Sequence, residues 1–224
     1  MSSDGFLSFT DLRRVIIDRL RTLGSLERTS YGWNMRIVAG LAKGRKIESP
    51  KGMDVRPTTD RVREALFSSI AFRIRGARVL DLFAGTGALG LEALSRGAAS
   101  AVFVERDHRF AALVNRNIAA CGFDTRTRLF TTDALKAIVS LGAENLQFDL
   151  IFMDPPYNGP MLEKGLDAVQ DNALLAPNGL IAAEHPANRP PSVPIGLAVA
   201  TAKRYGKTVL SFIQRALDIE ATES

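Results

Sequence analysis

The turn Asp154-Pro155-Pro156-Tyr157 holds the residues best suited to chemistry, directly after the apolar run 148–153. Such a run predicts a buried strand of a parallel sheet. The two prolines remove two backbone N–H donors and keep the chain extended. The turn therefore presents acceptors, namely the Asp154 carboxylate and the carbonyl oxygens, beside the ring of Tyr157. These acceptors suit the two N–H donors of a nucleobase exocyclic amine, although an Asp-Pro turn with a surface tyrosine is a simpler alternative.

A glycine-rich loop with the sequence GTGALG at 85–90 follows an earlier predicted strand and has the G-x-G-x-x-G spacing of nucleotide-binding loops. Asp81 lies four residues before Gly85, at the carboxyl end of that strand. A carboxylate there opposes a pyrophosphate, whereas it attracts a ligand that carries an ammonium and a sulfonium group. Asp81 therefore favours S-adenosylmethionine over NAD, with a helix-capping or turn acid as the alternative.

Two further carboxylates follow the next two predicted strands. Glu105 ends the second strand about twenty residues after the loop, where an acid can accept hydrogen bonds from both ribose hydroxyls of either cofactor. Asp133 follows the third strand, where it could bind the adenine amine or equally cap the next helix. The predicted cofactor contacts are Asp81, Phe83, Gly85, Gly87, Glu105, Asp133 and Ala134.

Positive charge is concentrated before the first core strand. Residues 35–75 carry ten Lys and Arg against four acids, whereas residues 76–224 carry fourteen bases and sixteen acids. A local basic stripe is the footprint expected for a phosphate backbone, although a solvated surface is the alternative. The predicted RNA contacts in this segment are Arg36, Lys43, Arg45, Lys46, Arg56 and Arg61.

Composition excludes several classes of protein. Cys121 is the single cysteine, which excludes an internal disulfide, and two histidines leave no plausible zinc cluster. No apolar run approaches the ~20 residues of a membrane span, and residues 1–8 lack the pattern of a secretory signal. We therefore expect a cytoplasmic protein without a metal or a membrane partner.

Strand-like and helix-like segments alternate from residue 78, which predicts an α/β fold with a mostly parallel sheet and helices on both faces. The expected strands are 78–83, 100–105, 128–131, 148–153 and 179–184, with a terminal antiparallel hairpin at 197–205 and 208–214. The expected helices are 91–96, 107–120, 134–141 and 161–172. Before this core, we expect short strands at 35–39 and 46–49 and a helix at 61–71, capped by Thr58, Thr59 or Asp60.

These segments group into four regions. Residues 1–34 are an extension of unknown role, and 35–75 form a basic hairpin and helix that dock RNA. We expect 76–217 to form the domain that binds S-adenosylmethionine and carries out the chemistry, and 218–224 to form a loose tail.

Taken together, the motifs resemble the bacterial RsmD family of class I S-adenosylmethionine-dependent methyltransferases, which act on guanine N2 in small-subunit ribosomal RNA. The resemblance covers 35–214 and rests on MRIVAG with GRK at 35–46, on RPTTDRVRE at 56–64, on DLFAGTGALGLEALSRG at 81–97 and on the DPPY turn. It implies a Rossmann-like fold with a seven-stranded sheet. Family members usually begin at the position of Met35, so 1–34 are an extension or a mis-assigned start.

The resemblance also implies a mechanism. Asp154 and the Pro155 carbonyl would accept the amine hydrogens, Tyr157 would stack on the base, and Pro156 would complete the catalytic turn. The expected partner of a monomeric enzyme is ribosomal RNA or a small-subunit assembly particle, and the expected product is S-adenosylhomocysteine. Alternatives are a DNA adenine or protein glutamine methyltransferase, an NAD oxidoreductase, and a non-catalytic RNA-binding module.

Overall fold

The structure is a computed structural model that describes residues 31–50, 57–156 and 160–223. The predicted site residues Arg56 and Tyr157 lie outside the described residues, as do residues 1–30 of the extension.

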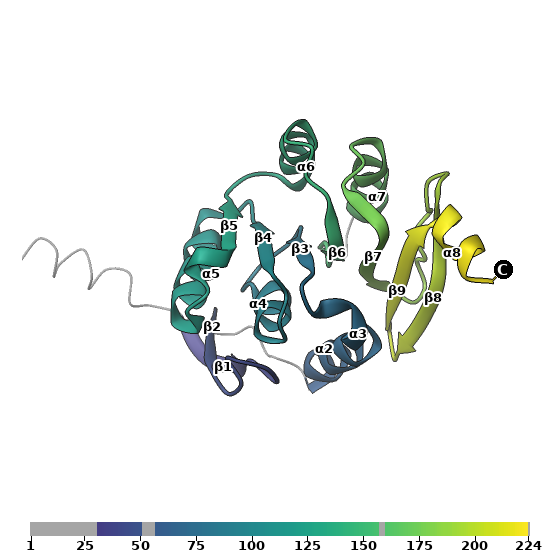
Figure 1. Cartoon of the computed structure of the whole chain (residues 1–224). Coiled ribbons are helices and arrows are strands. Elements are labelled where there is room, and N and C mark those ends of the chain that lie inside the picture. The colour runs from purple at the N-terminus through teal and green to yellow at the C-terminus, as the bar shows by residue number, and fades with distance from the viewer. Residues whose placement is uncertain (1–30, 51–56, 157–159, 224) are drawn as a thin grey trace, which may run out of the picture.

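A seven-stranded sheet forms the centre of the molecule (Figure 1). Its strands are β3 (Arg78–Asp81), β4 (Ser100–Val104), β5 (Thr127–Phe130), β6 (Phe148–Met153), β7 (Leu175–Pro186), β8 (Leu197–Tyr205) and β9 (Thr208–Arg215). The strand order is β5-β4-β3-β6-β7-β9-β8. Strands β3 to β7 are parallel, and β9 pairs antiparallel with both β7 and β8. This arrangement confirms the expected mostly parallel sheet with a terminal antiparallel hairpin.

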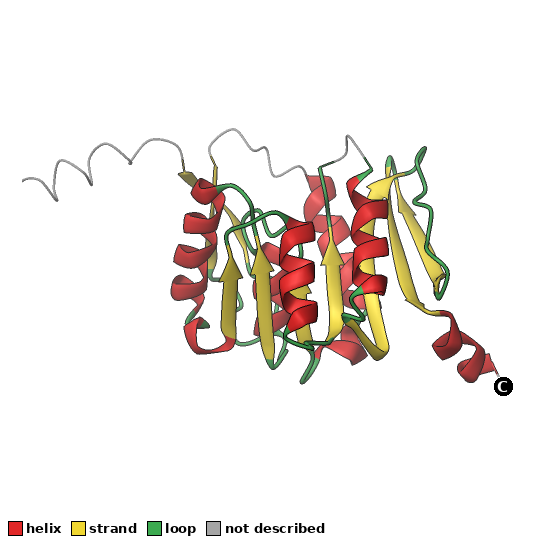
Figure 2. Cartoon of the chain, turned by 90° about the horizontal axis from the view of Figure 1, so that it is seen from above, coloured by secondary structure: helices red, strands yellow, loops and turns green. Residues whose placement is uncertain are grey.

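Helices cover both faces of the sheet, as Figure 2 shows from above. The elements are α2 (Pro57–Ser69), α3 (Ala71–Ile74), α4 (Ala88–Ser95), α5 (His108–Cys121), the 3-10 turn η1 (Asp124–Arg126), α6 (Ala134–Ala143), α7 (Met161–Asp171) and α8 (Ala216–Glu223). One buried core joins one face of the sheet to α2, α4 and α5. A second core joins the other face to α6 and α7. The separate cores follow from strands that are apolar on both faces.

Helix α5 shows how well local signals place an element. Asp107 caps its amino end by accepting the N–H of Arg109 at 2.8 Å, and Gly122 ends it in the left-handed conformation with φ 72°. The expected helix at 107–120 is therefore confirmed, with bounds that differ by one residue at each end. Cys121 is buried in the first core, as expected for a small core residue.

The segment before the core differs from the expectation in its details. Strand β1 (Tyr31–Arg36) pairs with β2 (Lys46–Pro50) in a separate two-stranded sheet, so the prediction of a strand at 35–39 is wrong in its position. The strand ends at Arg36 because Val38 and Ala39 donate their N–H groups to a side chain, the carboxylate of Glu92, instead of a partner strand.

Two further expectations about helices are wrong. Helix α2 begins at Pro57, four residues before the expected start at 61, so 58–60 lie inside its first turn. Proline suits this first position because its missing N–H has no helical partner there. Residues 218–223 are not a loose tail but belong to α8. This end is tied down because the Asp218 carboxylate accepts the Asn178 N–H at 2.8 Å and pairs with Arg215.

Candidate active site and nucleic-acid interface

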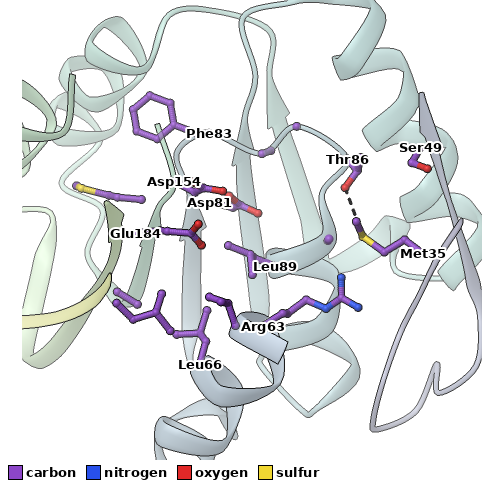
Figure 3. Close-up of a pocket in the computed structure, with 17 residues that line it drawn as sticks. Met35, Ser49, Arg63, Leu66, Asp81, Phe83, Thr86, Leu89, Asp154 and Glu184 are labelled. Atoms are coloured by element: carbon purple, nitrogen blue, oxygen red, sulfur yellow. Dashed lines mark hydrogen bonds between the residues drawn. The ribbon is translucent and has the colours of Figure 1, made fainter. Parts of the chain in front are cut away.

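A cavity of about 320 Å³ opens at the carboxyl ends of β3, β6 and β7 (Figure 3). The chain turns from β3 toward β4 on one side and from β6 toward β7 on the other, so this is the point where an open α/β sheet binds its ligand. Four predicted site residues line the cavity: Asp81, Phe83, Gly85 and Asp154. The structure thus brings Asp154, the first residue of the predicted catalytic turn, and the start of the glycine loop together, whereas Pro155 and Pro156 are not part of this lining.

Asp81 ends β3 and lies on the floor of the cavity, 3% exposed. Its Oδ2 accepts the N–H of Gly90 in α4 at 3.1 Å. Burial raises the pKa of Asp81 to about 7, the Gly90 hydrogen bond opposes this rise, and the charge of Glu105 adds to it. Asp81 therefore has both of the roles that we considered. It accepts a hydrogen bond near the start of helix α4, as a helix-capping acid would, and it also lines the ligand cavity.

Asp154 lies at the mouth of the cavity, at the end of β6. Its side chain reaches solvent there, yet protein surrounds the carboxyl closely enough for desolvation to matter. Desolvation first, and then the charges of Glu184 and Asp81, raise the pKa of Asp154 to about 8. A carboxyl with such a pKa can take up a proton near neutral pH.

Glu184 is a cavity residue that the sequence analysis missed as a site residue. It belongs to β7, beside the catalytic turn, and the carboxylates of Asp81, Asp154 and Glu184 gather in one part of the cavity (Figure 3). The sequence did contain a signal that could have identified Glu184 as a site residue, because it is the last residue of the expected strand 179–184. Asp81 is likewise the last residue of β3, and Asp154 directly follows β6.

The glycine loop is held by backbone hydrogen bonds to Glu105. The two carboxylate oxygens of Glu105 accept the N–H groups of Gly85 and Asp107, each at 2.9 Å. Gly87 begins α4 in the left-handed conformation, with φ 79°. A Cβ atom at Gly90 would overlap the ring of Phe103, so the third glycine lets α4 pack directly on the sheet.

The remaining predicted cofactor contacts lie outside the lining of this cavity: Gly87, Glu105, Asp133 and Ala134. Asp133 caps α6, since its Oδ1 accepts the N–H of Leu135 at 2.9 Å. We predicted that Asp133 either binds adenine or caps the next helix, and this hydrogen bond shows the cap. An adenine contact at this position stays a prediction.

Five residues of the segment 35–75, which we predicted to dock RNA, line the cavity. They are Met35, Ser49, Val62, Arg63 and Leu66. Buried Arg63 donates to the Arg36 carbonyl at 3.2 Å. Since these residues come from β1, β2 and α2, the basic segment forms one wall of the active site.

The predicted RNA contacts that the structure describes are all exposed: Arg36, Lys43, Arg45, Lys46 and Arg61. Within the described part of the chain, none of these five forms an ion pair, whereas several core arginines bind carboxylates: Arg78 with Asp149, Arg128 with Glu144 and Arg215 with Asp218. Four of the five lie on the N-terminal hairpin: Arg36 follows the cavity residue Met35 in β1, and Lys43, Arg45 and Lys46 lie at the hairpin turn and the start of β2. We call these four residues the basic row. The hairpin turn is fixed to the end of α4, because the Leu41 N–H binds the Ser95 carbonyl at 2.8 Å.

Two other kinds of site are absent from residues 31–50, 57–156 and 160–223. No group of three or more His, Cys, Asp or Glu residues in these ranges has an arrangement that could hold a metal ion. No helix in the same ranges is both long and apolar enough to cross a membrane. Buried His185 of β7 is hydrogen-bonded to Ser211 Oγ at 2.8 Å.

Comparison with known proteins identifies the family. The family model described as conserved hypothetical protein 95 matches residues 35–214. The chain is 37% identical over 182 residues to ribosomal RNA small subunit methyltransferase D of Escherichia coli K12, covering 81% of this chain and 90% of that protein. It is 32% identical over 172 residues to the protein of the same name from Haemophilus influenzae, covering 77% and 89%.

A solved structure supports the same assignment. A hypothetical protein of Thermus thermophilus aligns with a TM-score of 0.68 and 31% identity, covering 80% of this chain and 98% of that one. The family model spans most of the chain, and the curated relatives are matched over most of their length. The chain therefore belongs to the conserved hypothetical protein 95 family, which includes ribosomal RNA small subunit methyltransferase D.

Proposed function

We propose that this protein methylates the exocyclic N2 amine of a guanine in small-subunit ribosomal RNA, with S-adenosylmethionine as the methyl donor. The observation that carries the proposal is the meeting of Asp81 and Asp154 in one cavity, at the ends of neighbouring strands. The relatives named ribosomal RNA small subunit methyltransferase D support the choice of RNA. Guanine N2 is the finer part of the proposal and rests on the resemblance to their family.

The cavity suits a positively charged ligand. When bound, S-adenosylmethionine supplies a methyl group activated by a sulfonium charge, and it also carries an ammonium group. Asp81 would hold the ammonium end, with Phe83 and Gly85 beside it on the cavity wall. Glu105 already accepts two N–H groups, yet each of its oxygens has a second lone pair for a ribose hydroxyl.

Asp154 would act on the amine. The lone pair of a nucleobase amine is delocalised into the ring, so the amine must be held and oriented before it can react. Asp154 and the Pro155 carbonyl would accept its two hydrogens, which directs the lone pair toward the activated methyl group. When the methyl group passed to the nitrogen, its bond to sulfur would break with the electron pair left on S-adenosylhomocysteine, and the nitrogen would lose one proton to water or to the ionised form of Asp154, whose raised pKa makes it the stronger base.

The RNA would lie along the basic row, on the same hairpin that contributes Met35 and Ser49 to the cavity. Exposed side chains without carboxylate partners are available for phosphates, since no ion pair has to break first. A paired or stacked target guanine must be flipped out to reach Asp154, at a cost of a few kcal/mol. Stacking on Tyr157 stays part of the proposal.

The test is methyl transfer to small-subunit ribosomal RNA that lacks modification, followed by nucleoside mass spectrometry. The expected product is N2-methylguanosine at one position. Asp154→Asn should lower the rate by at least about a hundredfold while S-adenosylhomocysteine still binds. Two results would overturn the proposal: detection of the new methyl group on an adenine, or near-normal turnover by Asp154→Asn.

A further inference from the structure

Glu184 stands beside Asp154 in a fixed geometry. Met153 pairs with Ala183 in the parallel ladder of β6 and β7, so the next residue on each strand is a carboxylic acid. Neighbouring strands lie about 4.8 Å apart. The carboxylates of Asp154 and Glu184 both point into the cavity (Figure 3). Two acceptors with this spacing can engage two adjacent donors on one flat molecule.

The direction of the Glu184 side chain is set by its strand. Side chains alternate along a strand, and Ala182 and Glu184 both line the cavity. His185 points the opposite way, where it is 5% exposed and binds Ser211 Oγ on β9 at 2.8 Å. Glu184 is itself paired with Leu210 of β9, another cavity residue. Strand β7 is thus held on both edges, which keeps the Glu184 side chain on the cavity face of the sheet.

Glu184 also lies on the substrate side of the cavity. The predicted cofactor contacts lie on β3, on the loop after it, and beyond β4 and β5, whereas β7 lies across β6 from them. The target amine must reach Asp154 at the end of β6. The rest of the base then extends toward β7, so Glu184 faces the ring atom next to the amine-bearing carbon.

The chemistry of the purine edge decides what such a pair of carboxylates can bind. Guanine presents two adjacent donors, its N2 amine and its N1–H. Adenine presents one donor, its N6 amine, next to an unprotonated N1 that is an acceptor. Guanine would satisfy both carboxylates, whereas the adenine N1 would face a carboxylate oxygen, which repels it. The pair of acids therefore favours guanine.

We propose that Glu184 accepts the N1–H of the target guanine while Asp154 accepts a hydrogen of its N2 amine, so that Glu184 determines the choice of base. This inference rests on the proposed function and adds a specificity-determining residue to it. The charge of Glu184 also helps to raise the pKa of Asp154, which places the two carboxyls close together. A hydrogen bond to a charged group should discriminate by about tenfold to a hundredfold.

The test compares two RNAs in the same assay. One is a fragment of small-subunit ribosomal RNA with the guanine that the wild-type protein methylates, and the other carries 2-aminopurine at that position. 2-Aminopurine keeps the N2 amine but has an unprotonated N1, so it isolates the contact assigned to Glu184. 2-Aminopurine also lacks the O6 of guanine. This difference affects the wild-type protein and a Glu184 variant alike, so it cancels when the ratio of kcat/KM for the two RNAs is compared between the two proteins.

The wild-type protein should prefer guanine, and Glu184→Gln should lower that preference by at least about tenfold, because its amide can donate to N1 of 2-aminopurine. Asp154→Asn is the matched control, since it should slow both RNAs by the same factor. Glu184→Asp keeps a carboxylate and should keep the preference. Melting temperature and S-adenosylhomocysteine affinity check that each variant is folded.

Two results would overturn the inference. The first is that Glu184→Gln slows both RNAs equally, which would make Glu184 a general electrostatic residue. The second is that Glu184→Gln leaves both rates unchanged. If the wild-type protein methylates no guanine in ribosomal RNA, the proposed function itself fails, and this outcome is distinct from both.

Discussion

The two β-hairpins of this chain are attached to the core by different means. The C-terminal hairpin, β8–β9, extends the central sheet, because β9 pairs with β7 from Ile181 to Pro186. The N-terminal hairpin, β1–β2, forms its own small sheet and is attached through buried polar side chains of α4 and α5. A backbone ladder tolerates the loss of one side chain, whereas an attachment by side chains depends on each of them.

Glu92 is the centre of the N-terminal attachment. It is fully buried, and its oxygens accept the N–H groups of Val38 and Ala39 at 2.7 and 3.1 Å. Arg96 pairs with it at 2.6 Å and lies 4.9 Å from the ring centre of Phe67. This pairing compensates the buried charge.

Asn117 joins the same hairpin to the glycine loop. Its amide oxygen accepts the Glu48 N–H at 2.8 Å, and its amide nitrogen donates to the carbonyls of Glu48 at 3.1 Å and Thr86 at 2.9 Å. Asn117 thus fixes the position of the hairpin that carries the basic row relative to the glycine loop that borders the ligand cavity. The N-terminal hairpin therefore contributes a wall of the ligand cavity through Met35 and Ser49, whereas the C-terminal hairpin completes the sheet and contributes Leu210.

The largest expected effect comes from removing Glu92. Glu92→Ala should lower the free energy of unfolding by about 3–5 kcal/mol, because two N–H groups and the Arg96 guanidinium lose their partner. The control is Glu144→Ala, which removes a surface ion pair with Arg128 and should cost far less, because exposed ion pairs contribute little to stability. Urea unfolding measures both values, and equal losses would show that the hairpin is not held by Glu92.

The next largest effect is on RNA affinity, and it compares a triple alanine variant of each hairpin. Replacing Lys43, Arg45 and Lys46 by alanine should weaken RNA binding about tenfold to a hundredfold and reduce the slope of log K against log salt by up to about one unit per lost phosphate contact. Replacing the three exposed bases of the C-terminal hairpin should change both quantities far less; these are Lys203, Arg204 and Lys207. S-Adenosylhomocysteine binding should stay the same in both triple variants.

An equal loss of RNA affinity in the two triple variants would contradict the difference between the hairpins. RNA affinity and salt slope that stay at wild-type values in the N-terminal triple variant would show that the basic row is only a solvated surface.

A smaller effect should follow from Asn117→Ala. It leaves the Thr86 carbonyl and two backbone groups of Glu48 without their side-chain partner, which should cost about 2 kcal/mol of stability. It should also weaken S-adenosylhomocysteine binding, because the glycine loop loses a support. Ser211→Ala removes a buried hydrogen bond of the C-terminal hairpin and should leave that affinity unchanged. Isothermal titration compares the two variants, and unchanged affinity in Asn117→Ala would separate the hairpin from the cofactor site.

The smallest effect is the pH dependence of cofactor binding, which should be independent of both hairpins. Burial raises the pKa of Asp81 to about 7, so this acid is about nine-tenths ionised at pH 8 and about one quarter ionised at pH 6.5. The ionised form attracts the ligand ammonium, so S-adenosylhomocysteine affinity should fall about fourfold as the pH falls between these values. Asp81→Asn should bind weakly at both pH values. A pH dependence that persists in Asp81→Asn would assign it to another group.

The elements that were predicted well are those with complete local signals. The apolar run ending at Met153, with two prolines after it, has the bounds of β6 as predicted. Gly122 ends α5 where a left-handed residue is needed. In contrast, the strand predicted at 35–39 was wrong in its position, because Val38 and Ala39 donate hydrogen bonds to Glu92, which is 54 residues away from Val38 in the sequence. No local pattern reveals a partner at that distance.

The class of fold, the glycine loop and the acids that end β3 and β6 could all be predicted from local sequence, since they depend on periodicity, turn chemistry and charge within a few residues. Which carboxylates meet could not be predicted in this way. Glu184 reaches Asp154 because β7 pairs with β6 in a register that no local pattern specifies. Met35 enters the same cavity because Glu92 and Asn117 position the hairpin that carries it. Contacts between distant segments arise from packing, which depends on the whole chain.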